Sequence, residues 1–143
     1  MPTLPEIAEA VKTISDQFEG SFTMKSPGGT YFHANDYFLE NLGLLRENVI
    51  GKTDADLFPK ERADFAKKTD MEAFESRMPV EYNGSLLFNK QKIDYYAVKW
   101  VFFLPQGLPF CICTLSDYVV NKPRILDFKK KINVFLEMMV PAD

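Results

Sequence analysis

The chain has 143 residues, of which 46% are hydrophobic and 26% are charged, and its formal net charge is −3 at pH 7. These values indicate one globular domain and exclude a disordered chain. The negative net charge argues against direct nucleic-acid binding, which needs a basic face. No stretch reaches the ~18 apolar residues of a membrane span, and the N-terminus lacks the basic and apolar regions of a signal peptide. We therefore expect a cytoplasmic protein that contacts neither nucleic acid nor a membrane.

A helix with one apolar face is predicted over residues 4–18, and Gly20 ends it. Its apolar residues recur at spacings of three and four, which is a heptad pattern. These residues are Leu4, Ile7, Val11, Ile14 and Phe18. We expect this helix to flank the domain as a separate segment over residues 1–19.

A hairpin and several helices are predicted next. The strands of the hairpin span residues 21–25 and 30–33, on either side of a Ser-Pro-Gly-Gly turn. Short helices are expected at 36–42 and 54–58, and we expect Asp54 to cap the second of them. A longer helix follows from residue 59 to about residue 76.

Three strands are predicted in the second half of the chain, over residues 80–88, 92–104 and 108–116. In the last two strands both alternating sets of residues are apolar, whereas a sheet with one solvated face alternates apolar and polar residues. We therefore expect both faces of the sheet to be covered. The central helices would cover one face, and the N-terminal helix or a partner's copy of it would cover the other.

The C-terminal residues 124–139 are predicted to form a second heptad helix. Because we see no free surface for this helix on the domain, we expect a parallel coiled coil between two copies, with residues 119–143 linking the domain to an output domain. The candidate residues of a dimer seam come from both heptads. They are Ile7, Val11, Ile14, Phe18, Ile125, Phe128, Ile132 and Phe135.

Short motifs between residues 20 and 118 resemble PAS domains in their order and spacing. Residues 22–25 (Phe-Thr-Met-Lys) and 29–35 (Gly-Thr-Tyr-Phe-His-Ala-Asn) are similar to the opening hairpin of that family. Residues 54–59 (Asp-Ala-Asp-Leu-Phe-Pro) are the most specific segment, and Asp117 resembles the aspartate that commonly ends the PAS sheet. The resemblance implies an α+β fold over residues 20–118, with a five-stranded antiparallel sheet, helices packed on one face, and flanking amphipathic helices.

PAS domains sense a ligand or cofactor, or dimerise, so the resemblance implies a sensor and dimerisation domain of a signal-transduction protein. The family occurs in histidine kinases, cyclic-dinucleotide enzymes and transcription regulators. His33 is the only histidine, and no serine lies in a nucleophile motif, so we expect no catalytic site. We also expect no metal site, because no acidic cluster has calcium-loop spacing.

The sequence argues against the two cofactors that are familiar in the family. Haem-binding members usually take their ligand from the long helix or nearby, and no histidine lies there. Flavin-binding members carry a reactive cysteine in an Asn-Cys-Arg motif, which this chain lacks. An unidentified small molecule is left as the candidate ligand.

The candidate pocket residues combine aromatic walls with a few polar groups. They are Asn35, Phe38, Phe58, Phe65, Tyr95, Lys99, Cys111, Cys113 and Leu115. The last three share one strand face, which by resemblance faces the pocket. Lys99 lies in an apolar strand, where it could meet an anionic ligand or extend its ammonium group to the edge. The aromatic side chains could also fill the pocket, so two functions stay open: a homodimeric ligand sensor attached to an output domain, and a stand-alone protein–protein interaction module with no ligand.

Overall fold

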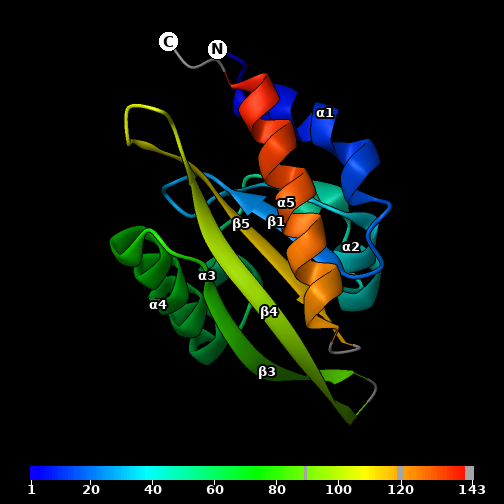
Figure 1. Cartoon of the computed structure of the whole chain (residues 1–143). Coiled ribbons are helices and arrows are strands. Elements are labelled where there is room, and N and C mark those ends of the chain that lie inside the picture. Colours follow the sequence, from blue (N-terminus) through cyan, green and yellow to red (C-terminus); the bar gives the residue numbers. More distant parts are fainter. Residues whose placement is uncertain (89, 119–120, 141–143) are drawn as a thin grey trace.

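A five-stranded antiparallel sheet with the strand order β2-β1-β5-β4-β3 forms the centre of the molecule (Figure 1). The structure is a computed structural model and describes residues 1–88, 90–118 and 121–140. Its elements are α1 (Leu4–Ser15), β1 (Ser21–Lys25), β2 (Tyr31–Ala34), α2 (Asp36–Leu42), the 3₁₀ turn η1 (Arg46–Asn48), α3 (Asp54–Leu57), α4 (Lys60–Ser76), β3 (Val80–Phe88), β4 (Gln91–Phe103), β5 (Pro109–Asp117) and α5 (Lys122–Met139). The predicted α+β fold with five antiparallel strands is confirmed.

The central helices begin and end where the local chemistry favours it. Asn35 caps α2 by accepting a hydrogen bond from the backbone N–H of Phe38 at 3.1 Å. The same helix ends at Gly43, whose φ of 64° is a left-handed conformation that glycine adopts without strain. Helix α3 is capped by Thr53, so the prediction that Asp54 caps it is wrong. The carboxylate of Asp54 is thereby free to point into the fold.

Helix α1 is shorter than predicted, ending at Ser15 instead of residue 18. The chain tightens after Ser15, where the N–H of Phe18 donates to the Ser15 carbonyl at 3.2 Å. This turn places the Phe18 ring against Phe128 of α5, with the ring centroids 4.6 Å apart. Phe18, the last apolar residue of the predicted heptad, therefore packs outside the helix.

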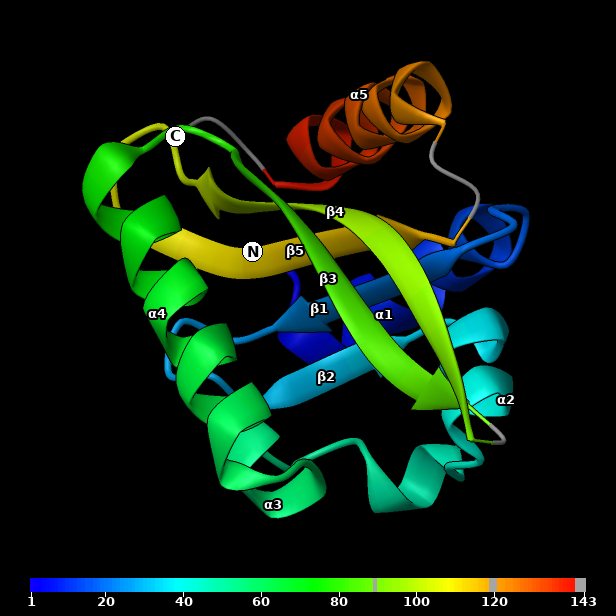
Figure 2. The same ribbon diagram turned by 90° about the horizontal axis from the view of Figure 1, so that it is seen from below.

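Helices cover both faces of the sheet, as the apolar strands predicted. Figure 2 shows α5 on one side of the sheet and α3 and α4 on the other. Helix α1 packs with α5, and the two share one core cluster with the facing side chains of the strands. We call the face under α1 and α5 the outer face, and the face under α3 and α4 the inner face.

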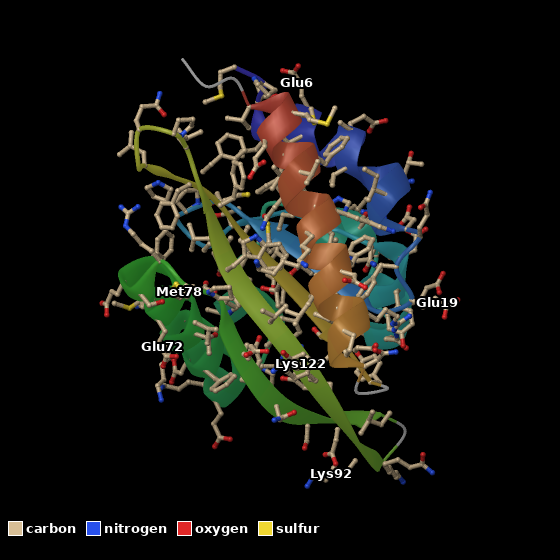
Figure 3. The ribbon with its side chains drawn as sticks, in the orientation of Figure 1. Glu6, Glu19, Glu72, Met78, Lys92 and Lys122 are labelled. Atoms are coloured by element: carbon tan, nitrogen blue, oxygen red, sulfur yellow. The ribbon has the colours of Figure 1, made fainter. Side chains whose placement is uncertain are left out.

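The prediction that the C-terminal helix has no surface on the domain is wrong. In α5, Ile125, Ile132 and Leu136 are fully buried within this one chain. Trp100 of β4 also donates a hydrogen bond from its indole N–H to the Asn133 side chain at 2.8 Å. At the start of α5, Lys122 lies beside the β3–β4 pair (Figure 3), and its ammonium group is 3.1 Å from the Glu81 carboxylate. Residues 119–120 and 141–143, within the predicted linker, lie outside the described residues.

Candidate functional site: a charged cavity under the inner face

A cavity of about 80 Å³ lies between the inner face of the sheet and helices α2 to α4. Strands β1, β4 and β5 supply polar lining residues, among them Lys25, Lys99 and Thr114. The helical side supplies aromatic rings and Arg62 of α4. A cavity that combines apolar walls with a few placed polar groups has the character of a small-molecule site.

Four charged residues form one cluster beside this cavity, and we call them the buried charge cluster: Lys25 of β1, Asp54 of α3, Asp70 of α4 and Lys99 of β4. All of them except Asp70 line the cavity. The ammonium group of Lys25 lies 2.7 Å from Asp54 Oδ2 and 2.7 Å from Asp70 Oδ2. The ammonium group of Lys99 lies 2.6 Å from Asp70 Oδ1. Both lysine side chains are 3% exposed, so the cluster is shielded from water and salt. It joins two helices to two strands of the sheet.

Neighbouring groups complete the hydrogen bonds of the cluster. The Tyr31 hydroxyl donates to Asp54 Oδ1 at 2.5 Å. Lys99 also donates to Thr69 Oγ1 at 2.7 Å and to the Ala66 carbonyl at 3.2 Å. With the Asp70 ion pair, these contacts place three oxygen atoms within 3.2 Å of the Lys99 ammonium group. The burial of a lysine is costly unless it is paired in this way.

Burial and the neighbouring charges shift the titrating groups of the cavity. The pKa of Lys99 is lowered, first by burial and then by the positive charge of Lys25, while Asp70 opposes the shift. The pKa of the Tyr31 phenol is raised well above its usual value, by burial and by Asp54. Burial also raises the pKa of Tyr82, which therefore stays protonated and able to donate.

Five of the nine predicted pocket residues come together around this cavity. They are Phe38, Phe58, Phe65, Tyr95 and Lys99. Phe65 lies at the rim, since it is 41% exposed. Their role in binding a ligand stays a prediction.

Asn35 is fully buried, but it acts as a structural connection and does not line this cavity. Its side-chain amide donates to the carbonyls of Ser15 and Gly20, at 3.1 and 2.8 Å. Its side-chain oxygen accepts from the N–H of Phe22 at 3.0 Å, in addition to capping α2. The placement of Asn35 in the pocket was therefore wrong, because backbone partners use its donors and acceptor.

Cys111, Cys113 and Leu115 point to the outer face, so their placement in the pocket was also wrong. The antiparallel register pairs Trp100 with Cys113 and Lys99 with Thr114. Because directly opposed residues point to the same side of a sheet, Cys113 shares the side of Trp100, under α5. The two thiols lie 3.8 Å apart, and burial raises the pKa of Cys113 well above its usual value. Such a buried thiol is unreactive.

Sequence reasoning missed three members of the charge cluster and Arg62. The signal for Lys25 was weak: it is the one charged residue in the predicted hairpin strand over residues 21–25. Asp54 was predicted to cap a short helix, and nothing local to Asp54 or Asp70 showed that they would meet. They come together because α3 and α4 cross the same inner face of the sheet (Figure 2).

The predicted dimer-seam residues lie mostly inside the chain's own core. Ile7, Val11, Phe18, Ile125, Phe128 and Ile132 are all buried between the outer face and the two helices. Ile14 and Phe135 are only partly buried. A single chain does not test a seam between two copies, so the dimer stays a prediction.

No family model matches the chain, and no curated protein matches its sequence. Solved structures do match its fold. The PAS domain of Bordetella pertussis BvgS superposes with a TM-score of 0.67 at 14% identity, over 89% of this chain and 96% of that one. A sensory box sensor histidine kinase from Vibrio cholerae matches with a TM-score of 0.61 at 17% identity, over 76% of this chain and 87% of that one. VqmA bound to DPO matches with a TM-score of 0.64 at 20% identity, over 76% of this chain and 56% of that one.

In the part of the chain that the structure describes, no helix has the length and apolarity needed to cross a membrane. Within the same residues, no group of three or more histidine, cysteine, aspartate or glutamate side chains could hold a metal ion.

Proposed function

The chain has the fold of PAS domains, and from this premise we propose that it is a regulatory sensor domain of a signal-transduction protein. In this proposal a small ligand binds in the charged cavity and its presence is relayed to an output domain. The observation that carries the proposal is the cavity itself, in which the paired charges of Lys25, Asp54, Asp70 and Lys99 adjoin an open volume of about 80 Å³. A core that served packing alone would gain little from burying four charges, because apolar residues of similar volume are often at least as stabilising.

The sheet connects the cavity to the outer helices, which supports a relay. Lys99 and Trp100 are neighbours on β4 and point to opposite faces. Lys99 contacts α4 through Asp70, and Trp100 contacts α5 through Asn133. A ligand that shifts Lys99 would therefore move the strand that holds α5, and so bias two arrangements of that helix.

The end of the sheet provides a second contact to α5. Arg124 in the first turn of α5 pairs with the buried Asp117 at the end of β5. Its guanidinium also donates to the Glu19 carbonyl at 2.9 Å, and it lies over the Phe18 ring with 5.1 Å between its Cζ and the centroid. This contact joins β5, α5 and the segment after α1, which suits a junction that passes a change to an attached domain.

We also propose that the domain is a cytoplasmic homodimer with no enzymatic activity of its own, attached to an output domain. Such a dimer would use the parts of α1 and α5 that are left accessible, among them Ile14 and Phe135. One similar structure is a sensor histidine kinase. Another, VqmA, is described as a dimer in the absence of its target DNA, and this chain spans 55% of it. These likenesses make a kinase or a DNA-binding domain reasonable output candidates.

The alternative is a stand-alone protein–protein interaction module that binds no ligand. The observation in its favour is the size of the cavity, which is well below the ~300 Å³ or more of drug-sized ligand pockets. Only a small molecule would fit between the aromatic rings.

Native mass spectrometry of the purified chain tests the proposal directly. The sensor proposal expects a dimer that carries a bound small molecule, and the molecule should be released on denaturation. DPO, which is bound in the similar VqmA structure, is a reasonable first compound to add to ligand-free protein. A monomer that neither retains a ligand nor binds added compounds would overturn the sensor proposal and favour the interaction module.

The dimer seam has its own test. Phe135→Glu places a charge on a partly buried position of α5, so it should weaken a dimer that uses this helix. Lys131→Glu, at an exposed position of the same helix, is the control for adding negative charge. An unchanged sedimentation coefficient for Phe135→Glu would contradict a seam on α5.

A further inference from the structure

We propose that the charged cavity is built for a small monoanion, a carboxylate with a short apolar part, held by Arg62 and Lys25. This inference rests on the proposed ligand-binding function and names the chemical class of the ligand. It follows from the charges, the free donors and the size of the site.

The charges around the cavity do not balance. Three cationic side chains surround it, Lys25, Arg62 and Lys99, while the described carboxylates of the cluster are Asp54 and Asp70. The two lysines neutralise the two aspartates. Arg62 is only partly exposed and stacks on Phe58, with 3.9 Å between its Cζ and the ring centroid. Among the described residues no carboxylate lies within ion-pair distance of Arg62, so one positive charge is left at the cavity.

The hydrogen-bonding groups show the same imbalance. Each carboxylate oxygen of Asp54 and Asp70 lies within 2.7 Å of a lysine or tyrosine donor. Each aspartate oxygen thus already faces a cation or a phenol within the cluster. On the donor side, Lys25 uses two of its three N–H groups on the aspartates. The guanidinium of Arg62 and the hydroxyl of Tyr82 can also donate into the cavity, and among the described residues neither has a hydrogen-bond acceptor.

A planar guanidinium stacked on an aromatic ring is well suited to a carboxylate. Stacking on Phe58 holds the Arg62 guanidinium in one orientation, and its paired N–H groups match the two oxygens of a carboxylate. A monoanion would neutralise the remaining positive charge. A dianion would leave a negative charge in a shielded site, and a cation would add to the positive charge already present, so both are disfavoured.

The size of the cavity limits the rest of the ligand. One water-sized site takes up roughly 10–15 Å³ of such a volume. The cavity of about 80 Å³ therefore has room for about five to eight non-hydrogen atoms. The rings of Phe38, Phe58 and Tyr95 form apolar walls around this volume. A carboxylate with a short aliphatic chain fits both the walls and the donors.

Three probes of matched size test the charge preference: propionate, propionamide and propylammonium. The protein is unfolded and refolded to remove any retained ligand, and binding is followed by calorimetry and by the shift in Tm at constant ionic strength. Propionate should bind roughly tenfold or more tightly than propionamide, because its hydrogen bonds are charge-assisted, and propylammonium should not bind. Equal binding of propionate and propionamide would overturn the proposal.

Two variants on α4 test the residue assignment. Arg62→Gln should weaken propionate binding about tenfold or more while leaving propionamide binding nearly unchanged. Lys68→Gln removes the same charge from an exposed position of the same helix and should leave propionate binding unchanged. Equal effects of the two substitutions would overturn the role of Arg62, since only the overall charge would then matter.

A third variant separates the ligand class from the function itself. Thr114→Leu adds apolar volume to the cavity wall from β5, and circular dichroism checks its folding. If propionamide binds as well as propionate and Thr114→Leu abolishes both, the cavity binds ligands as proposed but the anion assignment is wrong. If propionate does not bind, the anion assignment is also overturned, and the sensor function is then decided by the retained ligand in the native mass spectrum.

Discussion

Removal of the Asp70 carboxylate tests how strongly the buried charge cluster holds α4 to the sheet. In Asp70→Ala, Lys99 loses an oxygen at 2.6 Å and Lys25 loses one at 2.7 Å, while both lysine side chains are only 3% exposed. The cluster changes from neutral to a net positive charge in a place that water reaches poorly. Breaking a buried ion pair in this way costs about 3–5 kcal/mol of the free energy of unfolding. With a denaturant slope of about 2 kcal/mol per molar, the urea midpoint falls by roughly 2 M.

Asp64→Ala is the matched control, because it makes the same substitution on the same helix. The Lys60–Asp64 pair also has a short separation of 2.6 Å, but its side chains are 87% and 62% exposed. Water and salt screen such a pair, so the midpoint of Asp64→Ala should stay within experimental error of the parent. Urea unfolding of both variants, followed by circular dichroism and tryptophan fluorescence, measures the difference. Equal midpoints for the two variants, at unchanged slope, would refute the argument from burial.

A double substitution checks that the cost comes from the orphaned charges. Asp70→Leu combined with Lys99→Met removes one anion and one cation and keeps the apolar volume. Because apolar residues often replace a buried ion pair with little loss, this variant should recover most of the stability lost in Asp70→Ala. A double variant less stable than Asp70→Ala would show that the cost comes from lost packing.

Three further predictions concern other parts of the fold. Burial, with Arg46 and Lys12 as smaller causes, lowers the pKa of His33 from its usual 6.5 to about 4, so the unfolded chain binds the extra proton first as the pH falls. His33 should therefore lower the free energy of unfolding by about 3 kcal/mol as the pH falls from 6.5 to 4. When unfolding is measured across this pH range, the decline should be shallower in His33→Gln. Ile132→Ala on the buried face of α5 should lower the free energy of unfolding by about 2–5 kcal/mol in the same urea assay. Val134 is 55% exposed, so Val134→Ala should change that free energy by less than about 0.5 kcal/mol. Equal losses for the two variants would contradict the packing of α5 on the sheet. A methyl group at Gly84 would lie 2.4 Å from the Tyr95 ring, so the ring must move in Gly84→Ala. This variant should shift the NMR resonances of Tyr95 and weaken propionate binding, because Tyr95 lines the cavity. An unchanged NMR spectrum would contradict this contact.

Much of the fold could be predicted because the relevant signals are local. The Pro-Gly turn, the spacing of apolar residues in α1 and the apolar run of β4 each act within a few residues, and the structure has the hairpin, helix and strand that they indicate. The apolar character of both strand faces also showed correctly that the sheet would be covered on both sides. What covers the outer face was not decided by these signals, since a heptad helix packs equally well on its own sheet or on a second copy.

The candidate site depended on information that no local pattern contains. The sequence by itself determined that Lys99 lies in an apolar strand, that aromatic residues surround it, and that a PAS-like arrangement of elements would hold them. Only the tertiary structure decided which alternate set of β5 residues faces the cavity, because this follows from the pairing of Lys99 with Thr114 across two strands. It also decided that Lys25, Asp54 and Asp70 meet Lys99, since these residues come from separate elements that become neighbours only when α3 and α4 fold over the sheet. Burial then determines the character of the site, because charges that would be ordinary on the surface must find partners once water is excluded.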